Sequence, residues 1–246
     1  MSTYSPAPSP SGIEQVIANY VATMVAFPDA LRGQQLRGGG AVAEFETLLA
    51  ERCGFPYCVA TNNATSALIA LAVVLAVRGR SVFFPRNHWE GSVAAFRLMG
   101  ARIKRYDPEK VLRCPPPRSG KPAVAVIVGS YHLRINHSSV TILIEDSCRL
   151  PGVSVPVGTG SFADVKVLSF GPGKSLSLGE GGAALFRSKM LYRKFVAVSQ
   201  HPERVSAEFS WRGSMPRMSL NARIHPVAAL LGCMLLNKTG LDQSPK

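Results

Sequence analysis

Lys174 lies in the glycine-rich segment SFGPGKS at residues 169–175, and this segment allows two kinds of site. In a P-loop, the pattern G-x-x-x-x-G-K-[ST] places a lysine on the phosphates of a nucleotide. That pattern would need glycine at position 168, where this chain has Leu168, so a P-loop is excluded. The remaining chemistry is that of an amine that forms a Schiff base with an aldehyde, on a turn that lets the backbone approach a bound group closely.

A pyridoxal-phosphate (PLP) site needs three kinds of group: an amine for the aldehyde, a carboxylate on the pyridine nitrogen, and hydrogen-bond donors around a dianionic phosphate. Lys174 offers the amine. Asp146 follows an apolar run in IEDS, which places its carboxylate at the carboxyl end of a strand, where open α/β sheets bind ligands. Thr65 and Ser66 lie at the start of an apolar helix, where free backbone N–H groups favour a phosphate. The residues therefore predict PLP as cofactor.

Each of these residues also has a simpler interpretation. Lys174 alone could be a solvated charge, although its spacing to Ser169 and to GEGG at residues 179–182 favours a site. Asp146 could cap a helix that follows its strand. Trp89 could be an aromatic residue of the core.

Hydrophobic patterns place these residues on alternating helices and strands. Helices are expected over residues 13–32, over a segment with Val42, Phe45, Leu48 and Leu49 on one face that ends at Gly54, over 64–77 with Asn62 and Asn63 as caps, and over 91–99. Strands are expected over residues 57–60, 81–84, 101–106, 123–128 and 140–144. Nearly continuous apolar strands are typical of sheets covered on both faces, so the expected fold is α/β, three-layered, with a mainly parallel sheet.

The composition is that of an ordinary globular chain, with 246 residues of which 46% are hydrophobic. The net charge of +13 could indicate nucleic-acid binding, but the basic residues are scattered. Only Arg102, Lys104 and Arg105 come close to a cluster, and one exposed strand accounts for their spacing. We therefore expect a small-molecule substrate and neither nucleic acid nor a membrane as partner.

Five cysteines are spread along the chain without a C-x-x-C pair, which favours free thiols in a reducing compartment over a zinc site or disulfides. No apolar stretch reaches the roughly 20 residues that a membrane span needs. No basic segment precedes the first apolar run, so we expect no signal peptide and a cytoplasmic location.

The motifs and their order resemble those of the DegT/DnrJ/EryC1/StrS sugar aminotransferases, of the fold-type I PLP class. The resemblance runs from about residue 36 to residue 236. NATSAL is similar to the family's S-G-T-x-A-L turn, PRNHWEGS to P-x-x-T-[FW]-x-A-T, IEDS to I-E-D-x-A-Q, SFGPGK to S-F-x-x-x-K, and NARIHPVAA to N-x-R-x-x-x-x-x-A-A.

The resemblance implies a role for each matching residue. Lys174 would form the Schiff base and transfer a proton at the substrate carbon, and Asp146 would pair with the pyridinium nitrogen. Trp89 would stack on the ring. The phosphate would be held by Thr65, Ser66 and Ser169, and by Asn221 of a neighbouring subunit, which implies a homodimer with shared active sites.

Two residues and the length of the chain depart from the family pattern. Arg149 stands where the family commonly has Gln or His, and a guanidinium there would stabilise the phenolic oxygen of the cofactor. His88 stands where the family usually has Thr. Two interpretations are open for it: a residue that faces the pocket, or a surface or structural histidine. The sequence also stops at Lys246, so the expected division is a tail over 1–12, a PLP-binding large domain over 13–237 and a tail over 238–246, with the usual C-terminal small domain largely absent.

The leading functional prediction is transfer of an amino group from a donor such as glutamate to a keto-sugar or a secondary-metabolite keto intermediate. Arg149 leaves open another PLP reaction, such as elimination, racemisation or condensation. A third hypothesis is a truncated, non-catalytic partner of a full-length relative.

Overall fold

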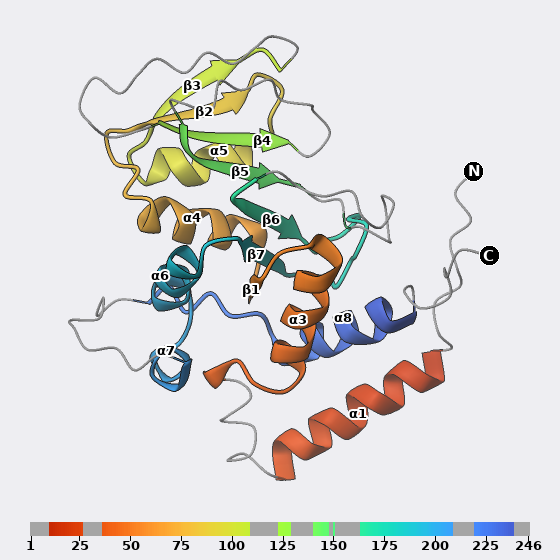
Figure 1. The fold of residues 1–246 in the computed structure, drawn as a ribbon. Helices are drawn as coiled ribbons and strands as arrows, with labels where there is room; N and C mark the ends of the chain where they lie inside the picture. The colour runs from red at the N-terminus through yellow and green to blue at the C-terminus, as the bar shows by residue number, and fades with distance from the viewer. Residues whose placement is uncertain are drawn as a thin grey trace, which may run out of the picture.

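The strands expected from the sequence belong to one seven-stranded sheet in the computed structural model (Figure 1). The structure describes residues 10–26, 36–108, 123–128, 140–147, 150, 163–208 and 219–238. The strands are β1 (Tyr57–Thr61), β2 (Ser81–Pro85), β3 (Arg102–Tyr106), β4 (Ala123–Val128), β5 (Val140–Asp146), β6 (Val165–Ser169) and β7 (Gly182–Phe186). Their order across the sheet is β1-β7-β6-β5-β4-β2-β3.

All pairings are parallel except the two made by β7, which runs antiparallel to both β1 and β6. The six other strands therefore point the same way, and their carboxyl ends meet at one edge of the sheet. The expectation of a mainly parallel α/β sheet is confirmed.

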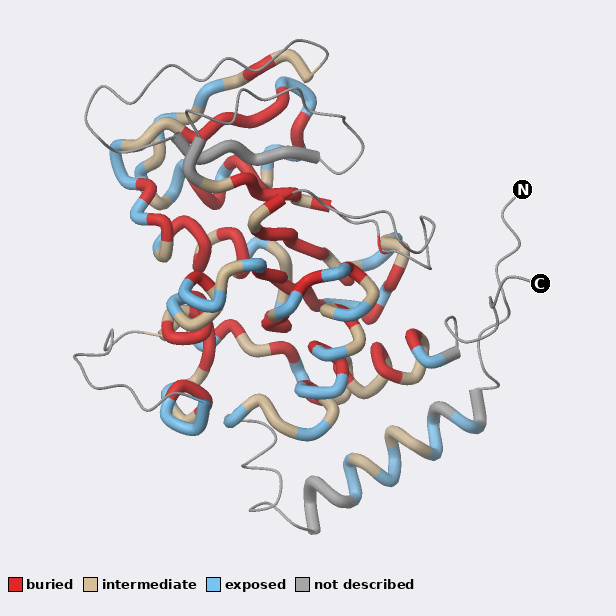
Figure 2. The backbone as a smooth tube through the Cα atoms, in the orientation of Figure 1, coloured by how far each residue is buried: buried red, intermediate tan, exposed pale blue. Residues whose placement is uncertain are grey.

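Helices cover both faces of the sheet (Figure 1). The described helices are α1 (Pro10–Ala26), α3 (Ala41–Cys53), α4 (Ala64–Val74), α5 (Glu90–Leu98), α6 (Lys189–Ser199), α7 (Pro202–Glu208) and α8 (Pro226–Lys238). One apolar cluster lies between the sheet and α4, α5 and α6, and the other lies between the sheet and α3 and α8. Buried segments run through the strands and the inner faces of these helices (Figure 2), which gives the expected three layers.

Local signals explain where several helices begin and end. Gly54 closes α3 in the left-handed conformation, and its backbone N–H bonds to the last turn of that helix. Asn63 caps α4, because its side chain accepts a hydrogen bond from the backbone N–H of Ser66 at 2.7 Å. Both caps agree with the sequence-based expectations.

The boundaries differ from the expected ones at several places. The first helix begins at Pro10, inside the expected tail, and its description ends at Ala26 instead of Arg32. Helix α4 ends at Val74, three residues early, and β5 continues through Asp146, so this residue is the last of its strand. The proline-rich stretch 114–122 and the short connection between β4 and β5 lie outside the described residues.

The basic residues at 102, 104 and 105 lie on β3, which is an edge strand of the sheet. Within the described part of the chain, no helix has the length and apolar character needed to cross a membrane.

Candidate active site

Four chain segments meet at the carboxyl edge of the sheet. Thr61, the last residue of β1, is paired with Gly182 at the start of β7, and Gly182 is paired in turn with Ser169 at the end of β6. Asp146 ends β5 and is in register with Val167 of β6. The expected phosphate turn, the Ser169–Lys174 segment and the Asp146 carboxylate are therefore brought together by strand pairing alone.

Lys174 lies in a loop that is closed at its base by hydrogen bonds. The N–H of Phe170 donates to the carbonyl of Gly181 at 2.9 Å, and the N–H of Leu178 donates to the carbonyl of Phe170 at 2.9 Å. Gly173, directly before the lysine, has φ +75°, a conformation that side chains rarely adopt. The Lys174 ammonium is half-buried and makes no hydrogen bond or ion pair to a described residue.

The first turn of α4 presents backbone N–H groups of the kind that bind anions. The first N–H groups of any helix have no acceptor inside the helix. In α4, the side-chain oxygen of Asn63 accepts a hydrogen bond from the N–H of Ser66. The N–H groups of Ala64 and Thr65 have no hydrogen-bond acceptor among the residues that the structure describes. The Thr61 hydroxyl donates to the carbonyl of Asn63 at 2.9 Å, which fixes the turn against the end of β1.

Gly182 allows this turn to lie close to β7. A Cβ atom on Gly182 would lie 2.4 Å from the backbone nitrogen of Ala64 and 2.5 Å from the carbonyl carbon of Asn63. These are backbone atoms and cannot move aside as a side chain would. The final glycine of GEGG is therefore required by the approach of the phosphate turn.

Asp146 is held by two side chains from the segment that follows β2. The Oδ2 atom of its carboxylate lies 3.0 Å from His88 Nε2 and 2.5 Å from the hydroxyl oxygen of Ser92, which donates to it. Ser92 lies in the first turn of α5, and both His88 and Ser92 are buried. The Asp146 side chain keeps 16% of its surface exposed, so a ligand can still reach it.

Trp89 lies between these two partners of Asp146 in sequence and begins α5 as its N-cap. Its side chain is 79% exposed, so the interpretation as a core aromatic residue is wrong. A Cβ on Gly91 would lie 2.6 Å from Trp89 Nε1, which shows that the indole lies over this glycine. The exposed ring is available for stacking.

Asn221 lies beside the phosphate turn of its own chain. The neighbouring Ala222 accepts a hydrogen bond from the N–H of Asn62 at 3.0 Å, and Thr61 forms an isolated β-bridge with Arg223. Asn221 has φ +49°, and its side-chain oxygen accepts from Arg223 Nε at 2.8 Å. A cavity of about 610 Å³ is lined by Asn62, Glu180, Asn221 and Arg223 together with residues of α1 and α8.

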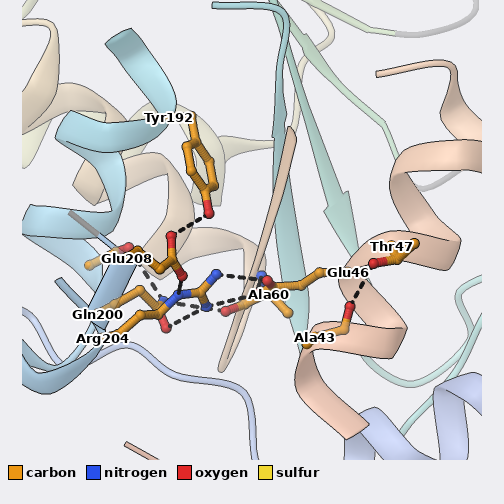
Figure 3. Close-up of polar contacts among 9 residues, drawn as sticks. Ala43, Glu46, Thr47, Ala60, Tyr192, Gln200, Arg204 and Glu208 are labelled. Atoms are coloured by element: carbon orange, nitrogen blue, oxygen red, sulfur yellow. Dashed lines mark hydrogen bonds and ion pairs between the residues drawn. The ribbon is translucent and has the colours of Figure 1, made fainter. Parts of the chain in front are cut away.

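A buried ion pair between Glu46 and Arg204 supports β1 along the edge that does not pair with β7 (Figure 3). The guanidinium of Arg204 donates to both carboxylate oxygens of Glu46, at 2.9 and 2.7 Å. Glu46 also accepts the backbone N–H of Ala60 at 2.8 Å, and Gln200 donates to the Ala60 carbonyl at 3.3 Å. Side chains thus satisfy the free edge of β1 immediately before the phosphate turn.

Burial shapes the electrostatics of this network. Burial raises the pKa of the Glu46 carboxyl, and the Arg204 guanidinium and the Ala60 N–H oppose that rise. Burial would lower the pKa of Arg204, but Glu46 and Glu208 outweigh it and raise this pKa. With three donors on one carboxylate, we take Glu46 to be ionised, so the pair acts as a charged clamp between α3 and α7.

The family model for the DegT/DnrJ/EryC1/StrS aminotransferases matches residues 21–125 and 132–243 of this chain. The chain belongs to this family. The resemblance stated from its motifs is therefore confirmed.

This family member is similar to a named sugar transaminase. A UDP-4-amino-4,6-dideoxy-N-acetyl-beta-L-altrosamine transaminase of Campylobacter jejuni is 27% identical over 87% of this chain. The match spans 61% of that relative, so the chain covers less than two thirds of its length.

Solved structures show the same fold at lower identity. An aminotransferase of Helicobacter pylori involved in the biosynthesis of pseudoaminic acid is 18% identical and has a TM-score of 0.67, covering 97% of this chain and 65% of that one. The E. coli GDP-4-keto-6-deoxy-D-mannose-3-dehydratase with bound hydrated PLP is 16% identical and has a TM-score of 0.63, covering 97% and 67% respectively. The fold-type I architecture is confirmed by these similarities.

Most of the site residues predicted for this family member lie at the same edge of the sheet. Asp146, Ser169, Lys174 and the turn with Thr65 and Ser66 are joined by the strand register described above. Arg149 lies outside the described residues. The roles of all these residues in cofactor binding stay predictions.

Sequence reasoning missed the contacts around Asp146. His88 and Ser92 come from the segment that follows β2, whereas Asp146 ends β5, so their contact depends on the order of the strands and has no local sequence signal. The Glu46–Arg204 pair was also missed, because its members are 158 positions apart.

Proposed function

We propose that this chain binds PLP at the carboxyl edge of its sheet and transfers an amino group from an amino acid such as glutamate to a keto-sugar. The observation that carries the proposal is the meeting of Asp146, the Lys174 loop and the first turn of α4 at that edge. An amine, a carboxylate and a phosphate-binding turn are the three elements the cofactor needs.

The described residues fit the cofactor group by group. The first turn of α4 offers the N–H groups of Ala64 and Thr65 at the positive end of a helix, which suits a dianionic phosphate. Because Gly182 has no side chain, this turn can lie directly against β7. In the proposal, the hydroxyls of Thr65, Ser66 and Ser169 add further donors to the phosphate.

At the other end of the cofactor, Asp146 would accept a hydrogen bond from the protonated pyridine nitrogen, and the two donors on its carboxylate hold it in place. Trp89 covers one face of the ring with its exposed indole. Bound PLP supplies an electron-withdrawing ring that stabilises negative charge on the substrate carbon. Lys174 holds the aldehyde carbon between turnovers and then carries a proton to or from the substrate carbon.

A nucleotide-linked keto-sugar is the proposed acceptor. The support is the Campylobacter relative, which is named as a transaminase of a UDP-linked amino-sugar. Because the chain covers 61% of that protein, the acceptor and the activity belong to this proposal and need a direct assay.

The homodimer expected from the sequence is part of the proposal. The cavity lined by Asn62, Asn221 and Arg223 adjoins the phosphate turn, so a second subunit bound there would approach the cofactor. The unit that binds the cofactor is proposed to span residues 13–237. Asn221 would then contact the phosphate held by the partner subunit.

The test is an absorbance spectrum of the purified protein with PLP. Wild type should develop a visible band that is absent in Lys174→Ala and retained in Lys189→Ala, which removes an exposed lysine of α6. Addition of glutamate should then remove the band and release 2-oxoglutarate. A wild-type protein that shows no band with PLP would overturn the cofactor assignment.

A second candidate keeps the cofactor and changes the reaction. Arg149 replaces the usual family residue near the phenolic oxygen, which favours elimination, racemisation or condensation as the alternative reaction. In that case glutamate would leave the visible band unchanged and yield no keto acid. The same spectrum therefore separates transamination from other PLP chemistry. A chain that binds no PLP but copurifies with a full-length relative would support the non-catalytic hypothesis.

A further inference from the structure

The two hydrogen bonds to Asp146 both reach the same carboxylate oxygen. His88 Nε2 and the Ser92 hydroxyl lie 3.0 and 2.5 Å from Oδ2. The Oδ1 atom accepts no hydrogen bond from any residue that the structure describes. Among the described residues, Oδ2 thus has two partners and Oδ1 has none, in a side chain that is 16% exposed.

The contacts of His88 determine where its proton lies. An ionised carboxylate only accepts hydrogen bonds, so the nitrogen facing Asp146 must carry the hydrogen. The His88 side chain is 3% exposed and packs against the ring of Phe84, with 5.3 Å between ring centroids. Its Nδ1 atom is buried and has no partner among the described residues. In the neutral ring, Nε2 therefore donates and Nδ1 carries the lone pair.

We propose that His88 is a positioning residue that, with Ser92, fixes Oδ2 of Asp146 and so directs Oδ1 at the pyridine nitrogen of PLP. The inference rests on the proposed function and adds an atomic assignment to it. Two donors on Oδ2 hold the carboxylate in one orientation and oppose rotation about its last side-chain bond. Because both donors are buried, water does not replace them, and their geometry is set by β2 and α5.

The test compares variants of His88 in the full chain with two forms of the cofactor. His88→Leu removes the donor, and His88→Gln restores an N–H close to the position of Nε2. Each protein is titrated with PLP and with 1-deaza-PLP, in which carbon replaces the pyridine nitrogen. Binding is followed by the visible absorbance that depends on Lys174, and the unfolding transition of the cofactor-free protein is recorded.

We expect His88→Leu to weaken PLP binding about 10- to 100-fold, because a carboxylate that is no longer held loses its charge-assisted hydrogen bond to the pyridine nitrogen. His88→Gln should recover most of the loss. The affinity for 1-deaza-PLP should be the same in wild type and His88→Leu, because this cofactor offers Asp146 no ring nitrogen. A residue with a purely structural role would change the affinity for both cofactors equally.

Two results overturn the inference while leaving the proposed function intact. One is wild-type affinity of His88→Leu for PLP, and the other is an equal loss for PLP and 1-deaza-PLP. Failure of wild type to bind PLP would instead overturn the proposed function, and the inference with it. If His88→Leu does not fold, the same comparison is made with Ser92→Ala, which removes the other donor to Oδ2.

Discussion

Gly182 at the start of β7 lies so close to Ala64 at the start of α4 that a methyl group on Gly182 would be 2.4 Å from the Ala64 nitrogen. This contact joins the antiparallel strand of the sheet to the helix turn that is proposed to hold phosphate. It also explains why the strand that follows the Lys174 loop begins with glycine. The position of the turn thus depends on a missing side chain.

Gly182→Ala should destabilise the protein by about 1–3 kcal/mol, because an extra methyl group in a packed region displaces its neighbours. Here the neighbours are backbone atoms of Asn63 and Ala64, so the turn must shift and PLP affinity should fall as well. Urea unfolding and a PLP titration measure the two effects.

Gly171→Ala is the matched control for this substitution. Gly171 lies in the Lys174 loop, and its added Cβ would meet only the Ser169 hydroxyl oxygen at 3.9 Å, an ordinary contact. We expect stability within about 0.5 kcal/mol of wild type. Equal stability losses in the two variants would show that the close approach of Gly182 is not the cause.

Asn63→Ala should cost about 1 kcal/mol, with a range of about 0.5–2 for the loss of a helix cap. The Asn63 side chain accepts the Ser66 N–H at 2.7 Å, and without it this donor has no acceptor in the first turn of α4. The neighbouring Asn62→Ala is the control, because Asn62 is exposed and contributes a backbone hydrogen bond that alanine retains. Urea midpoints of both variants give the comparison, and a larger loss for Asn62→Ala would contradict the cap.

How far the sequence predicts this fold depends on the range of each interaction. The cap at Asn63 and the strand expected over residues 140–144 come from local patterns, and both are found in the structure, where the strand continues through Asp146. Strand β7 was not predicted, because a short, wholly buried apolar run such as GAALF does not distinguish strand from helix. Its antiparallel pairing likewise follows from tertiary packing and not from its own residues.

The candidate site shows the same division. Lys174, Asp146 and Ser169 were identified from residue types and motifs, and strand register brings their segments together. The contact between His88 and Asp146 joins positions 58 residues apart and depends on the order of strands in the sheet. No local pattern contains that information.

Arg204→Met should destabilise the protein by about 3–5 kcal/mol, because it leaves the buried Glu46 carboxylate without its partner. The matched control is Arg97→Met. The Arg97 guanidinium lies 3.9 Å from Glu90 with side chains that are 61% and 68% exposed, and such pairs contribute about 0–1 kcal/mol.

The double variant Glu46→Gln/Arg204→Met tests the cause of this loss. It removes the uncompensated charge but keeps an acceptor for the Ala60 N–H, so it should be more stable than Arg204→Met alone. Guanidinium unfolding measures all three variants. If Arg204→Met were no less stable than Arg97→Met, the clamp between α3 and α7 would not contribute to stability.

The Cys53 thiol should make the protein less stable at alkaline pH. Burial raises the pKa of Cys53 to about 11, Glu145 adds to the rise, and Lys166 and Arg52 oppose it. In the unfolded chain this thiol titrates near its ordinary value of 9.0, so the unfolded state loses its proton first. The stability that the buried, protonated Cys53 thiol contributes to the folded state is complete below pH 9 and falls as the pH rises toward 11. By about pH 10.5 the loss should reach about 2 kcal/mol.

Urea unfolding of wild type and Cys53→Ala at about pH 8 and 10.5 isolates this contribution, because all other groups titrate in both proteins. The stability difference between them should shift by about 2 kcal/mol in favour of the variant, whereas parallel pH profiles would show that Cys53 does not titrate with a raised pKa.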